Sequence, residues 1–286
     1  MKKNGFKTGL LRSCENLMLS RATSDQKSTS ICVVIPVRNV EKMIGKVLHE
    51  IIEALKFYKI EILILDNASN DRTKENVYRV FQLFENKENL SLRYILNEMD
   101  LGYGGSLKKG LTLAKSSGYQ WIMIAHGDDQ ADWSSITSLI LATLKSNKYD
   151  LIITSRFMRG SHIENYSLQR KLGNYFFRIV TNKLMKTKMS DPGAAIIAIK
   201  SEKLILRWIS DLRNDYLFHP GLNIIFFTSN LSISEIPMNW RDASHPGEIK
   251  LIKYGFSLMK FIVLAFANRK IRKYSWIESV ARASNL

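Results

Sequence analysis

The sequence is short of cysteine and of long hydrophobic runs. Its two cysteines, Cys14 and Cys32, share no spacing typical of a metal or redox site, so we expect reduced thiols in a cytosolic protein. No uncharged apolar run reaches the roughly 18 residues that a membrane-spanning helix needs. Residues 1–30 also lack the continuous apolar segment of a signal peptide, and we expect them to form a flexible basic arm.

Acidic residues are scarce relative to basic ones. The 286 residues include 42 Lys and Arg against 26 Asp and Glu, a formal net charge of +16. Such an excess predicts anionic partners, which are nucleic acid, an acidic membrane face or phosphorylated substrates. A nucleic-acid-binding module would interleave aromatic and basic residues over one surface. Here the excess is concentrated at the chain ends, so we expect no nucleic acid partner.

Predicted strands and helices alternate along the first half of the chain. Segments rich in β-formers predict strands at 31–35, 60–65, 90–96, 121–125 and 150–155. The segments between them predict helices at 40–57, 71–84, about 106–117 and 134–145. This alternation predicts an α/β fold with a mostly parallel sheet that helices flank on both faces.

A polar cluster follows each of these five strands. The carboxyl ends of parallel strands share one edge of the sheet, so the five loops should line a single crevice. The clusters are Pro36 to Asn39, Asp66-Asn67, Asn97 with Gly102 to Gly105, His126 to Gln130, and Ser155-Arg156.

The fourth cluster carries candidate metal ligands. If the chain stays extended after Ala125, then His126, Asp128 and Gln130 fall on one side of it. Oxygen ligands suit Mg²⁺ or Mn²⁺, and the imidazole favours Mn²⁺. The alternative is an ordinary polar loop in which Asp129 or Asp132 caps the next helix, and these residues alone leave both interpretations open.

Taken together and in this order, the motifs resemble the inverting glycosyltransferase family two, which has the GT-A fold. The resemblance is greatest to the branch with dolichyl-phosphate mannose synthase and polyprenyl-phosphate sugar transferases. It covers residues 31–250 and includes Ser155-Arg156-Phe157, Asn182, Asp191-Pro192, Glu235-Ile236-Pro237 and Arg241 after the five clusters. It implies a GT-A catalytic domain at 31–248. The residue pattern after it predicts a basic amphipathic helical tail at 249–286.

The resemblance also implies roles for individual residues. Asp128, supported by His126 and Gln130 and with Asp129 as a rival, would hold the metal ion. Asp191, Arg156 and Arg241 would be catalytic, with Asp191 as the candidate base. The nucleotide sugar would be bound by Pro36, Arg38, Asn39, Asp66, Asn67, Asn97, Gly102, Gly104, Gly105 and Asp128. The alternatives are a turn or helix-capping role for Asp66 and, for Asp191, an Asp-Pro-Gly turn before a strand at 194–199.

Two departures from the family pattern stand out. His126 replaces the first aspartate of the family's Asp-x-Asp, which removes one negative charge from the metal site. The branch's Asp-x-x-Ser-Gly-Phe-Arg reads here as Asp191 to Ile197, without the serine and the arginine. A phosphate contact expected there would have to come from elsewhere, such as Arg156, Arg170 or Arg241.

The expected activity is inverting transfer of a sugar from a nucleotide-diphosphate sugar to a lipid-linked or glycan acceptor, in cell-envelope or surface-glycan assembly. The alternative is a polyprenyl-phosphate glycosyl synthase. A non-catalytic relative and a nucleotidyltransferase are less favoured, the latter because Val37 to Glu41 lacks a glycine-rich loop.

The tail predicts a second partner. Residues 251–267 are mostly apolar but contain Lys253 and Lys260, and a basic segment follows. This pattern favours a helix lying on an anionic membrane, hence a cytoplasmic protein held peripherally at the inner face. The alternative is a terminal helix packed on the catalytic domain. His219 and His245 lie in His-Pro dipeptides, which are more typical of loop residues than of catalysts.

Overall fold

The computed structural model describes residues 29–242, 251–271 and 275–285. The arm expected at 1–30 lies outside these residues except for Thr29 and Ser30, and His245 also lies outside them.

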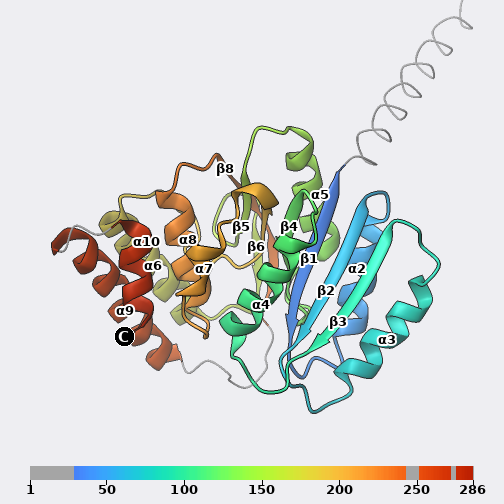
Figure 1. The fold of residues 1–286 in the computed structure, drawn as a ribbon. Helices are drawn as coiled ribbons and strands as arrows, with labels where there is room; N and C mark the ends of the chain where they lie inside the picture. The colour runs from blue at the N-terminus through green and yellow to red at the C-terminus, as the bar shows by residue number, and fades with distance from the viewer. Residues whose placement is uncertain (1–28, 243–250, 272–274, 286) are drawn as a thin grey trace, which may run out of the picture.

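A seven-stranded sheet with the order β3-β2-β1-β4-β7-β5-β8 forms the centre of the molecule (Figure 1). Every neighbouring pair is parallel except those that involve β7, which runs antiparallel to β4 and β5. The mostly parallel sheet is therefore confirmed, and the carboxyl ends of β1 to β5 meet at one edge. The strands are β1 Ser30–Val37, β2 Lys59–Asp66, β3 Leu90–Leu96, β4 Trp121–Ile124, β5 Leu151–Ser155, β7 Ile197–Lys200 and β8 Ile233–Pro237.

Helices cover both faces of this sheet. Successive residues of β1 point to opposite sides, so Ile31 and Val33 join one core cluster while Cys32 and Val34 join the other. The first cluster includes α2 Ile44–Leu55, α3 Thr73–Phe84 and α5 Trp133–Lys145. The second includes α4 Tyr103–Ser116, α7 Leu206–Ser210, α8 Phe218–Thr228, α9 Leu251–Ile271 and α10 Trp276–Ser284.

One more helix, a 3-10 turn and a second small sheet complete the described fold. Helix α6 Leu168–Met185 packs against α9, and a short 3-10 helix, η1 Ser201–Lys203, follows β7. A two-stranded sheet pairs β6 His162–Glu164 with β9 Asn239–Arg241.

The predicted tail helix has two different faces. Leu258, Phe261 and Ile262 of α9 are buried in the second core cluster, whereas Ile252 and Phe256 are exposed. The inner face thus packs on the domain, as the alternative for the tail assumed. None of the helices in the described part of the chain is long and apolar enough to cross a membrane.

Several element boundaries differ from the prediction. Helix α2 begins at Ile44 rather than Val40, because Val40 to Met43 form turns in which the Val40 N–H donates to Thr73 Oγ1 (2.9 Å). The strand expected at 194–199 is shorter and antiparallel. Helix α5 begins at Trp133, where Asp132 is the N-cap and accepts from Ser135 N–H.

Candidate active site

A pocket of about 1840 Å³ lies at the carboxyl edge of the parallel strands. It extends from the β1–α2 loop, past the loop after β4, to the inner sides of α6 and α9. Nine of the predicted site residues line this pocket: Pro36, Arg38, Asn39, Asn67, Gly102, His126, Asp128, Gln130 and Arg156. The lining does not include Asp66, Asn97, Gly104, Gly105, Asp129, Asp191 or Arg241.

One end of the pocket is organised around Asp100, which the sequence analysis did not single out. Its carboxylate accepts from Asn67 Nδ2 (2.5 Å) and from the Gly102 N–H (2.8 Å), and it pairs with Arg38. The Gly102 N–H and these side chains lower the pKa of Asp100, although partial burial opposes them. The carboxylate therefore holds Arg38 and Asn67 at the pocket wall.

Asp66 and Asn97 are buried behind this wall. Asp66 accepts from the Ser69 N–H (2.8 Å) and from the Tyr94 hydroxyl, and burial together with Asp66 raises the pKa of Tyr94. Asn97 donates to Ser106 Oγ (2.9 Å) and accepts from Lys109. The Ser69 contact is the turn bond that the alternative for Asp66 assumed, and nucleotide binding by either residue stays a prediction.

The glycines at the start of α4 allow a close approach of the backbone at Asn214. Gly102 has a φ of +73°, and a Cβ there would lie 2.4 Å from the Asn214 carbonyl oxygen. Gly104 donates its N–H to the same oxygen (2.7 Å), and a Cβ at Gly104 would lie 2.3 Å from the Arg213 carbonyl oxygen. Only glycine lets the 213–214 segment lie so close to α4.

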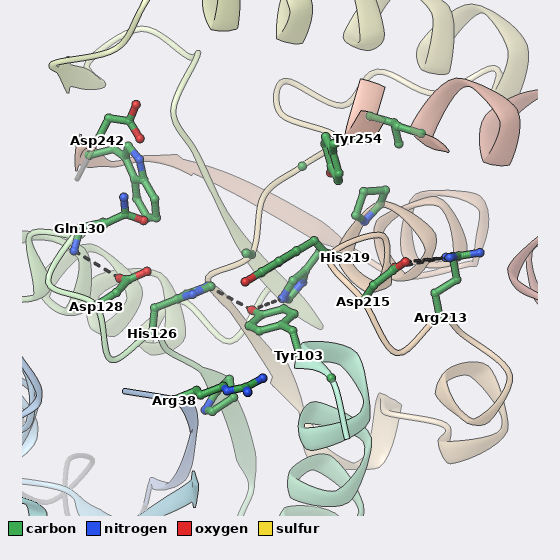
Figure 2. A pocket seen from close by; sticks show the side chains of 18 of the residues that line it. Arg38, Tyr103, His126, Asp128, Gln130, Arg213, Asp215, His219, Asp242 and Tyr254 are labelled. Atoms are coloured by element: carbon green, nitrogen blue, oxygen red, sulfur yellow. Dashed lines mark hydrogen bonds and ion pairs between the residues drawn. The ribbon is translucent and has the colours of Figure 1, made fainter. Parts of the chain in front are cut away.

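The loop after β4 presents three side chains to the pocket. His126, Asp128 and Gln130 line it together, which is the sidedness expected for an extended chain. Figure 2 shows Asp128 and Gln130 beside each other, and the Gln130 N–H donates to Asp128 Oδ1 (3.3 Å). Asp129 has a φ of +54°, does not line the pocket, and accepts a hydrogen bond from Lys46 Nζ (2.8 Å).

His126 belongs to a buried hydrogen-bonded chain with Tyr103 and His219 (Figure 2). The Tyr103 hydroxyl lies 2.8 Å from His219 Nε2 and 3.4 Å from His126 Nε2, and the His126 ring also bonds the Ala195 carbonyl. Burial lowers the pKa of both histidines, so both rings are neutral. Tyr216 stacks on Tyr103 (centroids 5.4 Å apart).

The tautomers follow from the bonding partners. If His126 donates from Nδ1 to Ala195, its Nε2 accepts from Tyr103, and Tyr103 accepts from His219 Nε2. His219 Nδ1 is buried without a hydrogen-bond partner, and in this arrangement it is a lone pair rather than a costlier N–H. Both ring nitrogens of His126 are then occupied within the protein.

The ligand set for a metal is smaller than the sequence predicts. Among the residues that the structure describes, no group of three His, Cys, Asp or Glu side chains could hold a metal ion. His126 is bonded to Tyr103 and Ala195, and Asp129 to Lys46, whereas the side chains of Asp128 and Gln130 line the pocket. Mg²⁺ often binds through one or two carboxylates plus substrate phosphates. These residues therefore fit an ion shared with a phosphorylated ligand, rather than a cage built by protein alone.

Arg156, which lines the pocket, forms a buried ion pair with Asp191 behind it. Arg156 Nε and Nη2 donate to the two oxygens of Asp191 (2.7 and 2.9 Å). The carboxylate also accepts the N–H groups of Arg156 and Gly193. Burial is the largest single influence and acts to lower the pKa of Arg156, but the charge and the hydrogen bonds of Asp191, with smaller contributions from Tyr166 and Tyr254, together raise the pKa. Asp191 therefore positions Arg156, and its role as a base stays a prediction.

The two remaining arginines lie differently. Arg241 is on β9 and pairs with Glu164 at an exposed site (3.0 Å), away from the pocket lining. Arg170 lines the pocket and pairs with Asp242. The predicted catalytic role of Arg241 receives no support from this placement, whereas Arg170 lies where an anion in the pocket could reach it.

Sequence reasoning missed the central Tyr103–His219 pair. His219 was expected to be a loop residue, but it lies in the first turn of α8 and only 3% of it is exposed. Tyr103 lies between Gly102 and Gly104 at the start of α4, and an aromatic residue within this glycine segment was the one local signal for it. No sequence signal links the two, because their proximity depends on how α4 and α8 pack.

Comparisons with known proteins agree with this geometry. Residues 32–225 match the family model described as Glycosyl transferase family 2. The dolichyl-phosphate beta-glucosyltransferase ALG5D of Trichomonas vaginalis is 23% identical over 232 residues, covering 76% of this chain and 68% of that protein. The dolichol-phosphate mannosyltransferase of Pyrococcus furiosus is 26% identical over 176 residues, covering 60% of this chain and 46% of that protein.

A solved structure with the same fold is the glucosyl-3-phosphoglycerate synthase of Mycobacterium tuberculosis in complex with Mn²⁺, uridine-diphosphate-glucose and phosphoglyceric acid. The TM-score is 0.58 at 16% identity, covering 86% of this chain and 80% of that one. The fold is thus GT-A-like, and the family model spans well over half of the sequence. The chain belongs to glycosyl transferase family 2, whose members transfer a sugar from a nucleotide sugar.

Proposed function

We propose that the protein inverts the anomeric centre as it transfers a sugar from a nucleotide-diphosphate sugar to a lipid-linked or glycan acceptor, in cell-envelope or surface-glycan assembly. The single observation that carries this proposal is the continuity of one pocket. Arg38 and Asn67 lie at one end, Asp128 follows, and Arg156 leads to the space beside α6 and α9. A donor and an acceptor can therefore meet in the same cavity.

The donor end supplies polar groups and a site for a shared ion. Asn39 and Asn67 offer amide groups for the nucleoside, and Arg38 is held by Asp100. Asp128 and Gln130 would hold Mg²⁺ or Mn²⁺, which when bound neutralises charge on the leaving nucleoside diphosphate. His126 is neutral at neutral pH because burial lowers its pKa, although the charge of Asp128 and the bond to Ala195 act to raise it.

The state of Asp191 bears on the acceptor. A hydroxyl acceptor must lose a proton as it attacks, which calls for a base with an available oxygen lone pair. Four N–H groups already donate to the Asp191 carboxylate. A lipid phosphate is ionised near neutral pH and needs an arginine rather than a base. This observation favours the second candidate function, a polyprenyl-phosphate glycosyl synthase.

Arg156 could bind such a phosphate without releasing Asp191. A guanidinium has five N–H donors, and Asp191 takes two of them. Arg156 also lies against the rings of Phe157 and Trp240 (5.3 and 5.8 Å to the ring centroids), which fixes its plane at the pocket wall. An anionic acceptor that enters beside α6 would therefore meet an oriented guanidinium.

A panel of nucleotide sugars, incubated with the protein and either Mg²⁺ or Mn²⁺, tests the proposal. We expect release of nucleoside diphosphate from one class of donor, and faster release when a polyprenyl phosphate is added. NMR of the first-formed product should show the anomeric configuration opposite to that of the donor. Failure to consume any donor would contradict the activity, and a retained configuration would contradict the single displacement.

Two neighbouring carboxylates provide a matched comparison for the ion. Asp128→Asn should reduce metal-stimulated donor turnover by about a hundredfold or more, because it removes the carboxylate proposed to bind the ion. Asp129→Asn should leave most of the turnover, since Asp129 binds Lys46 instead. If the two variants had the opposite effects, Asp129 would be the ligand.

A location at the inner face of the cytoplasmic membrane belongs to the same proposal. It is supported by the exposed residues Ile252 and Phe256 on α9 and by the exposed basic residues Arg269 and Lys270 near its end. Separation of a cell lysate into membrane and soluble fractions tests it, and complete recovery in the soluble fraction at low salt would contradict it.

A further inference from the structure

Helix α6 carries a stripe of exposed hydrophobic side chains that the proposed sugar transfer does not use. The stripe consists of Leu168, Leu172, Tyr175, Phe176 and Ile179, which are between 47 and 70% exposed. They recur at a spacing of three and four residues, so they form one outer face of the helix. No residue of α6 before Thr181 is fully buried.

The opposite side of α6 forms a wall of the pocket. Gly173, Asn174, Phe177 and Thr181 line the cavity, and Phe177 also packs against Gly255 of α9. The helix is therefore held by its inner side. Its outer stripe (Leu168, Leu172, Tyr175, Phe176 and Ile179) is left to solvent beside the substrate pocket.

The charge of this segment is entirely positive. Residues 165–190 contain six basic residues and no acidic one. Lys171 and Lys183 are exposed one helical turn from members of the stripe, and the Arg178 guanidinium lies over the Tyr175 ring (5.1 Å). An apolar face bordered by lysine and arginine is the pattern of helices that lie in the headgroup region of anionic bilayers.

We propose that the outer face of α6 docks the protein onto an anionic lipid bilayer. The bilayer fits both features at once, because its acyl region accepts the apolar stripe while its phosphates pair with the surrounding cations. A second copy of the chain fits less well, since two such faces would bring like charges together. The inference goes beyond the proposed sugar transfer and does not require it.

Vesicle flotation with the full chain tests the proposal. We expect binding to phosphatidylcholine vesicles that contain phosphatidylglycerol, weaker binding to phosphatidylcholine alone, and loss of binding at high salt. The double variant Leu172→Ser/Phe176→Ser should bind roughly tenfold more weakly or worse, because each side chain loses its transfer into the acyl region. Neither residue lines the pocket, so donor turnover in solution should persist.

The control is a second leucine and phenylalanine pair at the other end of the molecule. Phe57, just after α2, and Leu83, on α3, are 62 and 75% exposed, and Figure 1 places α2 and α3 far from α6. Phe57→Ser/Leu83→Ser should bind vesicles like the wild type. Equal binding by the α6 variant and the wild type, or an equal loss in the control, would overturn the proposal. Self-association without lipid that is lost only in the α6 variant would also overturn it, in favour of a dimer.

The experiment separates this proposal from the proposed activity. If the protein binds anionic vesicles through α6 but consumes no nucleotide sugar, the docking surface stands and the activity fails. If it consumes donor but ignores vesicles, the activity stands and the docking surface fails. A charge-reversed variant, Lys171→Glu/Lys183→Glu, should also lose vesicle binding, and unchanged salt-sensitive binding by this variant would contradict the electrostatic part.

Discussion

Replacing Asp191 with asparagine should weaken the fold and abolish turnover while nucleotide binding persists. The side chain of Asp191 is 1% exposed and that of Arg156 14%, so the pair is shielded from solvent. Asparagine keeps the shape but removes the charge, which leaves the guanidinium buried without a counterion. It also turns an amide N–H₂ toward groups that are themselves donors.

The size of the effect follows from the burial of the pair. Removing one partner of a buried ion pair costs about 3–5 kcal/mol, against a total stability of about 5–15 kcal/mol for a folded domain. The variant should therefore unfold at a clearly lower urea concentration, followed by circular dichroism. Because Arg156 loses its orientation at the pocket, sugar transfer should fall below detection, whereas nucleoside diphosphate binding, measured by calorimetry, should change little.

An exposed pair of the same chemical type provides the control. Arg241 and Glu164 are joined at 3.0 Å, but their side chains are 60 and 47% exposed. Glu164→Gln should leave the urea midpoint unchanged, because water and salt screen such a pair. The reasoning would be refuted if Asp191→Asn unfolded at the wild-type midpoint with normal turnover. An equal shift in Glu164→Gln would also refute it.

Three further predictions concern single residues. Gly102→Ala should lower the free energy of unfolding in urea by about 1–3 kcal/mol, because a Cβ would lie 2.4 Å from the Asn214 carbonyl oxygen. Gly118 also has a positive φ but no atom within 4 Å, so Gly118→Ala should cost only its backbone strain of about 1 kcal/mol. Equal costs in the two variants would contradict the close contact at Gly102. In a Cys14→Ser background, Cys32 should react with Ellman's reagent only when the protein unfolds, because burial and, to a smaller extent, Glu61 raise the pKa of its thiol. Rapid labelling of the folded protein would disprove this. Burial acts to raise the pKa of Asp71, but hydrogen bonds from the Thr73 hydroxyl and nearby N–H groups outweigh it, so the pKa is lowered in the folded protein. The stability that this shift contributes is present above the unfolded pKa of about 3.9 and is lost as the pH falls through the folded pKa. Asp71→Asn should therefore flatten the acid limb of the stability profile, and an unchanged limb would contradict the linkage.

The sheet could be predicted from sequence because its signals are local. The run Ile31 to Ile35 is continuously apolar, and it is buried on both sides of the sheet. Alternation of strand and helix then fixes parallel pairing, which places the polar clusters on one edge. The exception is β7, whose antiparallel pairing with β4 depends on the long connection through α6, and no local pattern announces it.

The interior of the site could be predicted only in part. The sidedness of His126, Asp128 and Gln130 follows from alternation, and all three line the pocket. By contrast, Asp129 is directed away from the pocket because of its positive φ and its bond to Lys46 on α2, and neither is visible in the local sequence. The Tyr103–His219 contact joins residues 116 positions apart, so it emerges only when α4 and α8 pack.

The two surfaces that we propose to contact a membrane show the same limit. The tail at 249–286 could be predicted as a candidate membrane contact because its excess of basic residues is visible in the sequence. The α6 stripe could not be predicted, because its sequence pattern is the same as that of a helix whose apolar side faces the core. Periodicity predicts an amphipathic helix, but only the packing shows whether its apolar side is covered. In α6 the pocket lies on the other side, and the stripe stays exposed.

Hydrogen–deuterium exchange with the nucleotide sugar that the protein consumes tests the central claim most directly, namely that the strand ends form one donor pocket. We predict slower exchange in residues 38–42, 67–71 and 126–130 together, with α3 unchanged as an internal reference. Protection confined to one of these segments, or found only outside the pocket while the donor is being consumed, would contradict the account.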